Sequence, residues 1–158
     1  MKSLSIVIIG YNTAKYLKKL LLSIQEAVLP HDIVVELIYI DDCSSDNSLN
    51  LFDSFETGLT KKSHRFSKNK GRVHATNKGV SLASSDWILF LQSNVTVDKN
   101  ILLEYQKAVE KTDCIAVGGK ILYESEDALF QQYLNSPMRG SNKCKQYENL
   151  HYEHLLFG

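Results

Sequence analysis

The segment IVVELIYIDDCSSDNS, from Ile33 to Ser48, joins a mainly apolar run to an acidic turn rich in serine. Ile33–Ile40 has the length and the β-branched composition of a strand, and it lacks the regular polar alternation of a strand with one wet face. Continuous apolar strands of this kind belong to parallel sheets that helices cover on both faces. The segment therefore predicts such a sheet, with ligand-binding side chains beginning at Asp41, directly after the strand.

Strands and helices alternate on both sides of this segment. Leu4–Gly10 is a similar apolar run, and the apolar residues after it recur at helical spacing until Pro30, which predicts a strand and an amphipathic helix. A strand, a helix and a second strand of these lengths form a right-handed unit with parallel strands. Further strands are expected at Ser63–Phe66, Trp87–Leu91 and Cys114–Leu122, and a loop at Thr57–Lys62. We therefore predict an α/β fold, a three-layer sandwich around a mostly parallel sheet.

Length, charge and cysteine usage narrow the class of protein. The 158 residues suffice for one domain with a core, and 18 basic residues balance 18 acidic ones, which argues against a broad nucleic-acid surface. No apolar stretch approaches the roughly 18 residues that cross a bilayer, and the N-terminus lacks a signal-peptide cleavage pattern. Cys43, Cys114 and Cys144 form no C-x-x-C pair, which is typical of reduced thiols. These features predict a cytoplasmic protein without a transmembrane segment that binds no nucleic acid.

Candidate ligand-binding side chains follow two of the strands. Asp41 and Asp42 could merely cap the next helix, yet one residue would suffice for that role. Two adjacent carboxylates carry like charges, and a hydrogen-bond donor, a cation or a ligand relieves that cost. Tyr11 and Asn12 follow the first strand; an aromatic ring beside an amide suits a planar base, although Asn12 could also be only a helix cap. We favour a binding role over a capping role for the two aspartates.

The strand at Trp87–Leu91 ends in three polar residues without charge, Gln92, Ser93 and Asn94. Residues at the carboxyl end of a parallel strand are the first candidates for chemistry. Chemistry on phosphates or on hard metal ions ordinarily uses carboxylates at such a place. Three neutral side chains there call for a different explanation.

The order of these motifs resembles that of family 2 glycosyltransferases. The chain has an apolar strand ending in Tyr-Asn, a second strand ending in DDCSSD, the segment NKGRVHATNKG and a strand ending in LFLQSN. Over roughly the first 120 residues, this set is similar to the nucleotide-sugar-binding part of that family, which has the GT-A fold. The resemblance implies transfer of a sugar from a nucleotide diphosphate donor, expected to be UDP-linked, to a glycan hydroxyl with inversion at the anomeric carbon.

The resemblance also implies which residues hold the donor. They are Tyr11, Asn12, Asp41, Asp42, Asn69, Gly71, Asn77, Gln92, Ser93 and Asn94. The first four would hold the nucleoside, with Asp42 contacting the base or the ribose. Asn69, Gly71 and Asn77 match the family's N-x-G…N-x-G segment beside the sugar nucleotide.

The N-x-G segment departs from the family at one position. Where the family often has an arginine before the second asparagine, this chain has Thr76, so a charge contact with the donor from that position is not expected. Four basic side chains surround the segment: Lys68, Lys70, Arg72 and Lys78. They either form a solvated face or attract the diphosphate.

A second departure concerns the metal. The family's strand normally ends in Asp-x-Asp, which helps to bind Mn²⁺ or Mg²⁺ against the diphosphate, and Gln92 and Asn94 occupy the two acidic places. Each missing carboxylate forfeits about 4 kcal/mol of attraction at 4 Å with an effective dielectric near 20. Three explanations remain open. Asn94 holds a metal that arrives with the donor, a basic side chain replaces the metal, or the site has lost activity.

The resemblance extends to domain organisation and cellular setting. We expect residues 1–122 to form the nucleotide-sugar-binding part and 123–158 to begin the acceptor side of the same domain, in a chain cut short there. The expected partners are a nucleotide-sugar donor and a glycan or lipid-linked glycan, in bacterial polysaccharide assembly at the inner face of a membrane, with peripheral membrane association. The carboxylates after Tyr123 are expected to be solvated surface charges, and no general base is nominated.

Two alternatives come from different classes of protein. A non-catalytic nucleotide-sugar-binding module would explain both the missing Asp-x-Asp and the missing acceptor half. A phospho-acceptor signalling domain also has paired aspartates after a strand, but there they follow the first strand, whereas Asp41 and Asp42 follow the second. A nucleotide triphosphatase is weaker still, because the chain has no G-x-x-x-x-G-K-[ST] loop.

Overall fold

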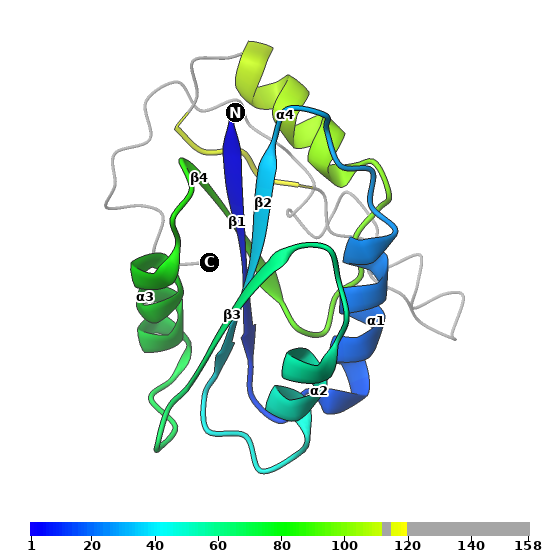
Figure 1. Cartoon of the computed structure of the whole chain (residues 1–158). Helices are drawn as coiled ribbons and strands as arrows, with labels where there is room; N and C mark the ends of the chain where they lie inside the picture. The colour runs from blue at the N-terminus through cyan, green and yellow to red at the C-terminus, as the bar shows by residue number, and fades with distance from the viewer. Residues whose placement is uncertain (112–114, 120–158) are drawn as a thin grey trace, which may run out of the picture. The chain divides into compact units, whose positions relative to one another are not determined.

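The computed structural model describes residues 1–111 and 115–119 of the chain (Figure 1). Its elements are, in chain order, β1 (Ser3–Gly10), α1 (Ala14–Gln25), β2 (Val34–Asp41), α2 (Ser48–Ser54), β3 (Thr60–Arg65), α3 (Arg72–Leu82), β4 (Trp87–Gln92) and α4 (Ile101–Lys111). The strands form one sheet in the order β3-β2-β1-β4, and each neighbouring pair is parallel. Since a helix follows every strand, the predicted α/β fold with a parallel sheet is confirmed.

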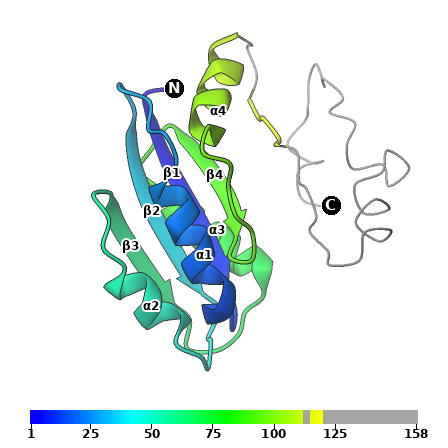
Figure 2. The same ribbon diagram turned by 90° about the vertical axis from the view of Figure 1, so that its right-hand side faces the viewer.

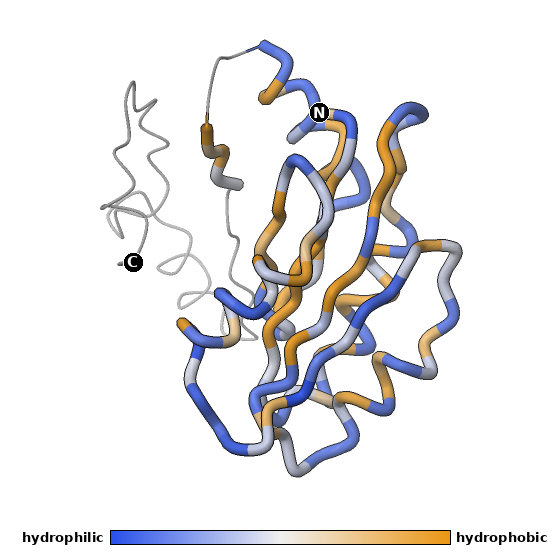
Figure 3. Tube along the Cα trace, turned by 60° about the vertical axis from the view of Figure 1, so that its left-hand side comes forward, coloured by the Kyte–Doolittle hydropathy of each residue, from blue (hydrophilic) through white to orange (hydrophobic). Residues whose placement is uncertain are grey.

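Helices cover both faces of this sheet. α1, α2 and α4 lie on one face, and α3 lies on the other (Figure 2). On the first face Ile6 of β1 packs in one buried cluster with Leu17 and Leu20 of α1, and on the second face Val7 packs with Ala75 of α3. The apolar stretches of the chain run through the strands between these layers (Figure 3). The three-layer arrangement is therefore the one that the alternating pattern predicted.

The continuous apolar runs mark the two central strands. In β1 and β2 nearly every residue is buried, because each strand has a strand on either side and helices above and below. β3 and β4 flank them, and their residues are half-buried or exposed. Phe90 of β4, for example, is 46% exposed.

α3 approaches the sheet closely at a glycine. Only Ala75 and Gly79 of this helix are buried, and they lie one turn apart on its sheet-facing side. A Cβ atom at Gly79 would lie 2.3 Å from Cγ1 of Val7 and 3.6 Å from Cγ1 of Ile40. The helix therefore packs through its backbone, and a side chain at position 79 would push it off the sheet.

A buried carboxylate lies inside the run that the sequence presents as apolar. Glu36 of β2 is 5% exposed, and Lys62 of β3 forms an ion pair with it at 2.8 Å. The Ser5 hydroxyl donates to Glu36 Oε1 at 2.6 Å, and the Ser84 amide and hydroxyl both donate to the same oxygen at 2.8 Å. A buried charge is tolerated only when it is paired and hydrogen-bonded in this way. Glu36 therefore ties β1, β3 and the end of α3 to β2.

We expect the free energy of unfolding to fall by about 3 kcal/mol as the pH is lowered through the acid range. Burial raises the pKa of Glu36, but hydrogen bonds from Lys62, Ser5 and Ser84 outweigh it and lower this pKa from 4.5 to about 2. A carboxyl with a depressed folded pKa stabilises the protein above its unfolded pKa and loses that contribution as the pH falls toward the folded value. Urea denaturation between about pH 6 and pH 2.5 measures the effect. The same acid dependence in Glu36→Gln would show that Glu36 is not its source.

Two predicted strands need correction. β3 starts at Thr60, inside the predicted loop Thr57–Lys62, because Lys61 and Lys62 find partners that a polar sequence does not reveal. The expected strand at Cys114–Leu122 is wrong for its described part, since 115–119 carry no strand. Gly118 and Gly119 weaken strand formation there, because glycine loses the most backbone entropy and has no side chain to pack. The remaining residues of that predicted strand lie outside the described ones.

Other predictions meet the structure only in part. Met1–Lys111 forms one compact unit, and the predicted acceptor-side region 123–158 lies outside the described residues, so the proposed domain boundary stays a prediction. Cys43 is a free thiol, and Cys114 and Cys144 are not described. Within 1–111 and 115–119, no helix combines the length and apolar character needed to span a bilayer.

Candidate functional site at the carboxyl edge of the sheet

The register of the sheet brings the candidate residues to one edge. Gly10 of β1 pairs with Asp41 of β2, and Asp41 pairs with Arg65 of β3, while Ile9 pairs with Gln92 of β4. The strand order runs outward from β1 to β3 and then returns to the other side of β1 for β4. The chain therefore has a topological switch point between β1 and β4, and ligands of open α/β sheets bind at the carboxyl ends of strands beside such a point.

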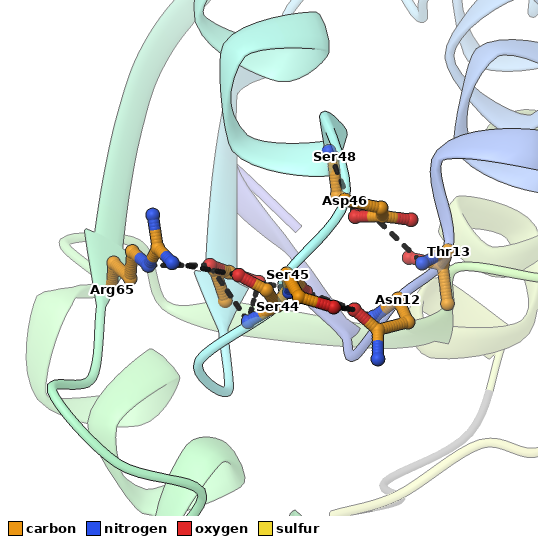
Figure 4. Close-up of polar contacts among 8 residues, drawn as sticks. Asn12, Thr13, Ser44, Ser45, Asp46, Ser48 and Arg65 are labelled. Atoms are coloured by element: carbon orange, nitrogen blue, oxygen red, sulfur yellow. Dashed lines mark hydrogen bonds and ion pairs between the residues drawn. The ribbon is translucent and has the colours of Figure 1, made fainter.

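Asn12 joins the loop after β1 to the loop after β2 (Figure 4). Its side-chain Oδ1 accepts hydrogen bonds from the Ser45 backbone amide at 2.8 Å and from the Ser45 hydroxyl at 3.2 Å. The backbone amide of Asn12 donates to Ser44 Oγ at 2.9 Å. Asn12 has a positive φ of 53°, a conformation that asparagine tolerates better than most residues. Asn12 is therefore not the side-chain cap of α1. Its neighbour Tyr11 is exposed in the same loop, at the edge of the sheet.

Asp41 has an internal role. It is fully buried, its Oδ2 lies 3.3 Å from Nε of Arg65, and the Ser44 amide donates to its Oδ1 at 3.2 Å. The Ser44 hydroxyl also donates to Asp41, and Arg65 in turn donates to the Ser44 carbonyl at 2.7 Å. These contacts occupy the carboxylate that the sequence placed among the donor-binding residues. Asp41 therefore orders the turn after β2, and a role for it in donor binding stays a prediction.

Asp42 joins two of the motifs that lie far apart in the sequence. Its Oδ1 accepts from the Lys70 amide at 2.7 Å, and its Oδ2 accepts from the Gly71 amide at 2.8 Å. Gly71 has a φ of 82°, which glycine adopts without strain, and it precedes α3. Asp42 is 4% exposed. It therefore fixes the turn before α3 against the end of β2, and any contact it makes with a ligand comes in addition to these two bonds.

The structure adds a residue to this edge, because Asp46 caps two helices. Its Oδ2 accepts from the Ala14 amide, the first residue of α1, at 2.9 Å, and its Oδ1 accepts from the Ser48 amide, the first residue of α2, at 3.0 Å. The Ser48 hydroxyl also donates to Asp46 (Figure 4). Neither helix has a hydrogen-bonded cap from its own N-cap side chain. The positive ends of both helix dipoles therefore meet one carboxylate, which is favourable.

We expect Asp46→Ala to lower the free energy of unfolding by about 2 kcal/mol, since replacing a capping residue by alanine costs about 0.5–2 kcal/mol and two helices lose their cap here. Desolvation raises the pKa of Asp46, but hydrogen bonds from Ser48 and Ala14 lower it below its ordinary value. The difference from wild type should therefore be present above about pH 4 and shrink as the pH falls below that. The control is Asp53→Ala, which also removes one carboxylate, but from a position in α2 that caps neither helix. Equal losses in the two variants would contradict the shared cap.

The end of β4 presents neutral oxygens. The Ser93 amide donates to the Ile9 carbonyl at 3.3 Å, and the Val95 amide donates to the Gln92 carbonyl at 3.4 Å, so the chain turns directly after the strand. Ser93 is buried, and Gln92 and Asn94 are exposed. Among the residues that the structure describes, no three His, Cys, Asp or Glu side chains are grouped to hold a metal ion. The Mn²⁺ or Mg²⁺ that the resemblance implies does not fit this turn, because amide and hydroxyl oxygens alone give it no charge compensation.

The remaining predicted residues lie around α3. Asn69 is exposed in the loop before this helix, and Asn77 is exposed on its second turn. Thr76 donates to the Arg72 carbonyl at 2.9 Å, so its hydroxyl is engaged within the helix. The structure therefore gathers Tyr11, Asn12, Asp42 and the turn at Gly71 at the carboxyl edge, and it leaves Asn69 and Asn77 without a contact to that set among the hydrogen bonds of the described residues.

Solved structures share this fold. Staphylococcus aureus TarS 1-349 in complex with UDP-GlcNAc matches 69% of this chain and 31% of its own, with a TM-score of 0.64 and 24% identity. The mannosyltransferase PcManGT from Pyrobaculum calidifontis, in complex with GDP-Man and Mn²⁺, matches 59% of this chain and 28% of its own, with a TM-score of 0.54 and 19% identity. With its parallel sheet and polar carboxyl edge, the molecule has the GT-A type of α/β fold.

Sequence comparison identifies the family. Residues 5–156 match the sequence model described as Glycosyl transferase family 2. The glycosyltransferase GlyG of Streptococcus pneumoniae is 30% identical over 133 residues, which cover 83% of this chain and 43% of GlyG. The poly(ribitol-phosphate) beta-N-acetylglucosaminyltransferase TarS of Staphylococcus aureus is 27% identical over 103 residues, which cover 65% of this chain and 18% of TarS. The chain belongs to glycosyltransferase family 2, as predicted, and it spans less than half the length of these two relatives.

Proposed function

We propose that the carboxyl edge of the sheet binds the nucleoside diphosphate of a sugar donor, and that the whole protein transfers this sugar to a glycan hydroxyl. The observation that carries the proposal is the convergence of three distant segments. Asn12 holds the loop after β1, and Asp42 holds the turn at Lys70 and Gly71, so that both loops border the end of β2. Family membership supports the reaction class, and the polar, preformed edge supports the donor site.

Each part of the edge has a role in this proposal. The ring of Tyr11 is 51% exposed and offers a stacking face for the base. The side-chain nitrogen of Asn12, Nδ2, points away from Ser45 (Figure 4) and is available to donate a hydrogen bond to the nucleotide. Asp42 positions the turn before α3 and accepts a further hydrogen bond from the base or the ribose. Gln92, Ser93 and Asn94 lie across the switch point, where the sugar and the diphosphate would sit.

The chemical step follows from the donor. The acceptor hydroxyl attacks the anomeric carbon in line, its proton passes to a base, and the nucleoside diphosphate leaves with the electrons of the broken bond, so the anomeric configuration inverts. The charge that develops on the diphosphate must be met by fixed positive groups. No carboxylate of the described residues is nominated as the base.

Relatives favour UDP as the nucleotide. Solved structures of TarS hold UDP-GlcNAc or UDP, while that of PcManGT holds GDP-Man. TarS is named for a poly(ribitol-phosphate) acceptor, and ExoO of Rhizobium meliloti is named a succinoglycan biosynthesis protein. We accordingly propose a UDP-sugar donor, a glycan or lipid-linked glycan acceptor and a cytoplasmic site of action at the inner face of a bacterial membrane.

Calorimetric titration of the chain with UDP, and with GDP for comparison, tests the donor site. We expect UDP to bind more tightly than GDP, with an affinity that changes less than about threefold between EDTA and Mn²⁺, because the turn at Gln92 gives a cation no carboxylate. Tyr11→Ala should weaken UDP binding roughly tenfold through the lost stacking, whereas Tyr16→Ala, which also removes an exposed tyrosine, should not. A strict requirement for Mn²⁺ would contradict the metal-independent site. Binding of neither nucleotide would contradict the donor site itself.

One observation favours a second candidate function. The neutral turn at Gln92–Asn94 removes the charges that assist departure of the diphosphate, and this suits a non-catalytic module that binds a nucleotide sugar. Release of free UDP from a UDP-sugar, measured with no acceptor present, distinguishes the two. Slow hydrolysis that Tyr11→Ala abolishes supports the transferase; tight binding of the intact UDP-sugar with no UDP released over days supports the module.

A further inference from the structure

Two serines of the turn after β2 contact the loop that carries Tyr11 and Asn12. Ser44 and Ser48 are only 2% and 0% exposed, although serine is a residue that mostly lies on protein surfaces. The hydroxyl of each serine both donates and accepts a hydrogen bond, and the donor and acceptor groups are of the same kind in both cases. The proposed function gives these two serines no role.

The first serine connects the buried Asp41 with the loop after β1. The Ser44 hydroxyl donates to the carboxylate of Asp41, and its oxygen accepts from the backbone amide of Asn12 at 2.9 Å. The Ser44 amide also donates to Asp41, and Arg65 compensates the charge of this carboxylate from 3.3 Å. A carboxylate that does not itself bond to Asn12 therefore acts on it through a serine.

The second serine makes the same connection one residue further along the loop (Figure 4). The Ser48 hydroxyl donates to Asp46, and its oxygen accepts from the backbone amide of Thr13 at 3.0 Å. Asp46 in turn accepts from the Ala14 amide at 2.9 Å. We call Asp41 with Ser44, and Asp46 with Ser48, the two Asp–Ser pairs. Together they bind three consecutive amides of the loop.

The carboxylate decides how each serine hydroxyl is oriented. A hydroxyl has one hydrogen and two acceptor lone pairs. Because the hydrogen is directed at a carboxylate, the hydroxyl cannot rotate away without losing a charge-assisted bond, and it presents a lone pair to the amide. Hydrogen bonds in such a chain also polarise one another. An Asp–Ser pair is therefore a stronger and more directional acceptor for an amide than a serine alone.

The loop depends on these bonds because its own side chains hold it only in part. Asn12 has a positive φ of 53°, and such a conformation persists only where the surroundings enforce it. The Thr13 hydroxyl has no hydrogen-bond partner among the described residues, so it does not tie the loop down. The amides of Asn12 and Thr13 precede Ala14, the first residue of α1. The two serines therefore fix the loop itself, beyond any capping of the helix.

We propose that Ser44 and Ser48, each oriented by its carboxylate, are positioning residues for the nucleoside of the donor. They hold the backbone of Asn12 and Thr13, so that the Tyr11 ring and the Asn12 side chain are in place before the nucleotide arrives. Neither serine touches the ligand; each acts through the loop. Holding the loop in advance removes the entropic cost of ordering it on binding. This inference rests on the proposed function, because it concerns the same donor site.

Calorimetric titration of UDP into serine variants of the 158-residue chain tests the proposal. The test variants are Ser44→Ala and Ser48→Ala, each made in the wild-type chain and in a Tyr11→Ala chain. Ser44→Thr and Ser48→Thr keep the hydroxyl and serve as conservative variants. The matched control is Ser54→Ala, which removes a hydroxyl that donates to the Leu51 carbonyl within α2. Urea denaturation of every protein reports its stability, and circular dichroism checks that it is folded.

We expect each alanine variant to bind UDP about tenfold more weakly than wild type, the effect of losing one hydrogen bond. The threonine variants and Ser54→Ala should stay within about threefold of wild type. In the Tyr11→Ala chain, the same serine changes should cost less than about threefold, because the ring that the loop positions is absent. The shift in the urea midpoint should be equal in both chains. A merely structural role would move affinity equally in both chains as well.

Hydrogen exchange of the backbone amides, followed by NMR, tests the contacts without any nucleotide. Ser44→Ala should speed the exchange of the Asn12 amide at least about tenfold, and Ser48→Ala should do the same for the Thr13 amide. Each variant should leave the other amide close to its wild-type rate. Ser54→Ala should change neither.

The two measurements distinguish failure of this inference from failure of the proposed function. UDP affinity that falls equally with and without Tyr11 would overturn the inference alone, because the serines would then act through the general fold. Slow exchange of both amides in the alanine variants would also overturn it, because other contacts would hold the loop. Wild type that binds no UDP, although both amides exchange slowly, would contradict the donor site itself and reduce the two Asp–Ser pairs to a structural role.

Discussion

Gly79→Val is expected to lower the free energy of unfolding by about 4 kcal/mol or more. Even a Cβ at this position would lie 2.3 Å from Cγ1 of Val7, a distance that real Cβ atoms essentially never show. Val7 is completely buried in the central strand β1 and has no room to withdraw. Overpacking of a close-packed interior forces the backbone to move, and here all of α3 would have to rise from the sheet.

Urea denaturation of Gly79→Val, Gly79→Ala and Gly58→Val measures the effect. A Cβ at Gly58 meets no atom within 4 Å, so the control should change stability by less than about 0.5 kcal/mol. Gly79→Ala should lie between the two, at about 3 kcal/mol. A Gly79→Val protein as stable as the Gly58 control would mean that α3 does not pack against β1 at this distance.

Asp42→Asn is expected to weaken UDP binding by about 100-fold and to lower the free energy of unfolding by about 2 kcal/mol. The carboxylate accepts from the amides of both Lys70 and Gly71, and an asparagine can accept only one of these bonds while its own N–H₂ group faces the other amide. The partly buried amide left unpaired costs about 1–3 kcal/mol. The turn before α3 then loses its fixed place beside the nucleoside site, and preorganisation is lost with it.

Calorimetry with UDP and urea denaturation separate the two parts of this effect. Asp32→Asn removes the same charge from an exposed loop, and it should leave both measurements unchanged. A large loss of stability with unchanged UDP affinity would show that Asp42 serves only the fold. Weaker UDP binding with unchanged stability would contradict the hydrogen bonds to the turn.

Much of the site is already present in the linear pattern. Tyr11, Asn12, Asp42 and the Gln92–Asn94 turn follow strands whose apolar runs are visible in the sequence, and parallel strands place their carboxyl ends together. The motif set led to the correct family and to the correct fold. Asp41 shows where this reasoning stops, because its neighbour Asp42 has the same side chain and the same place after the strand. Only the direction in which each carboxylate points decides that Asp41 binds Arg65, whereas Asp42 binds the turn at Gly71.

The sequence by itself determined the alternation of strands and helices, the burial of β1 and β2 on both faces, and the residues that follow each strand. These features are local: burial on both faces produces continuous apolar runs, and helices repeat their apolar residues at a fixed spacing. Tertiary structure alone decided the partners. Glu36 with Lys62 and Ser84, and Asp46 with Ala14 and Ser48, depend on register and on contacts between segments distant in the chain, for which a single sequence carries no periodic signal. For the same reason the sequence did not indicate the start of β3. Lys61 and Lys62 are typical of a polar loop, and only the tertiary structure shows that they bind the end of α2 and Glu36.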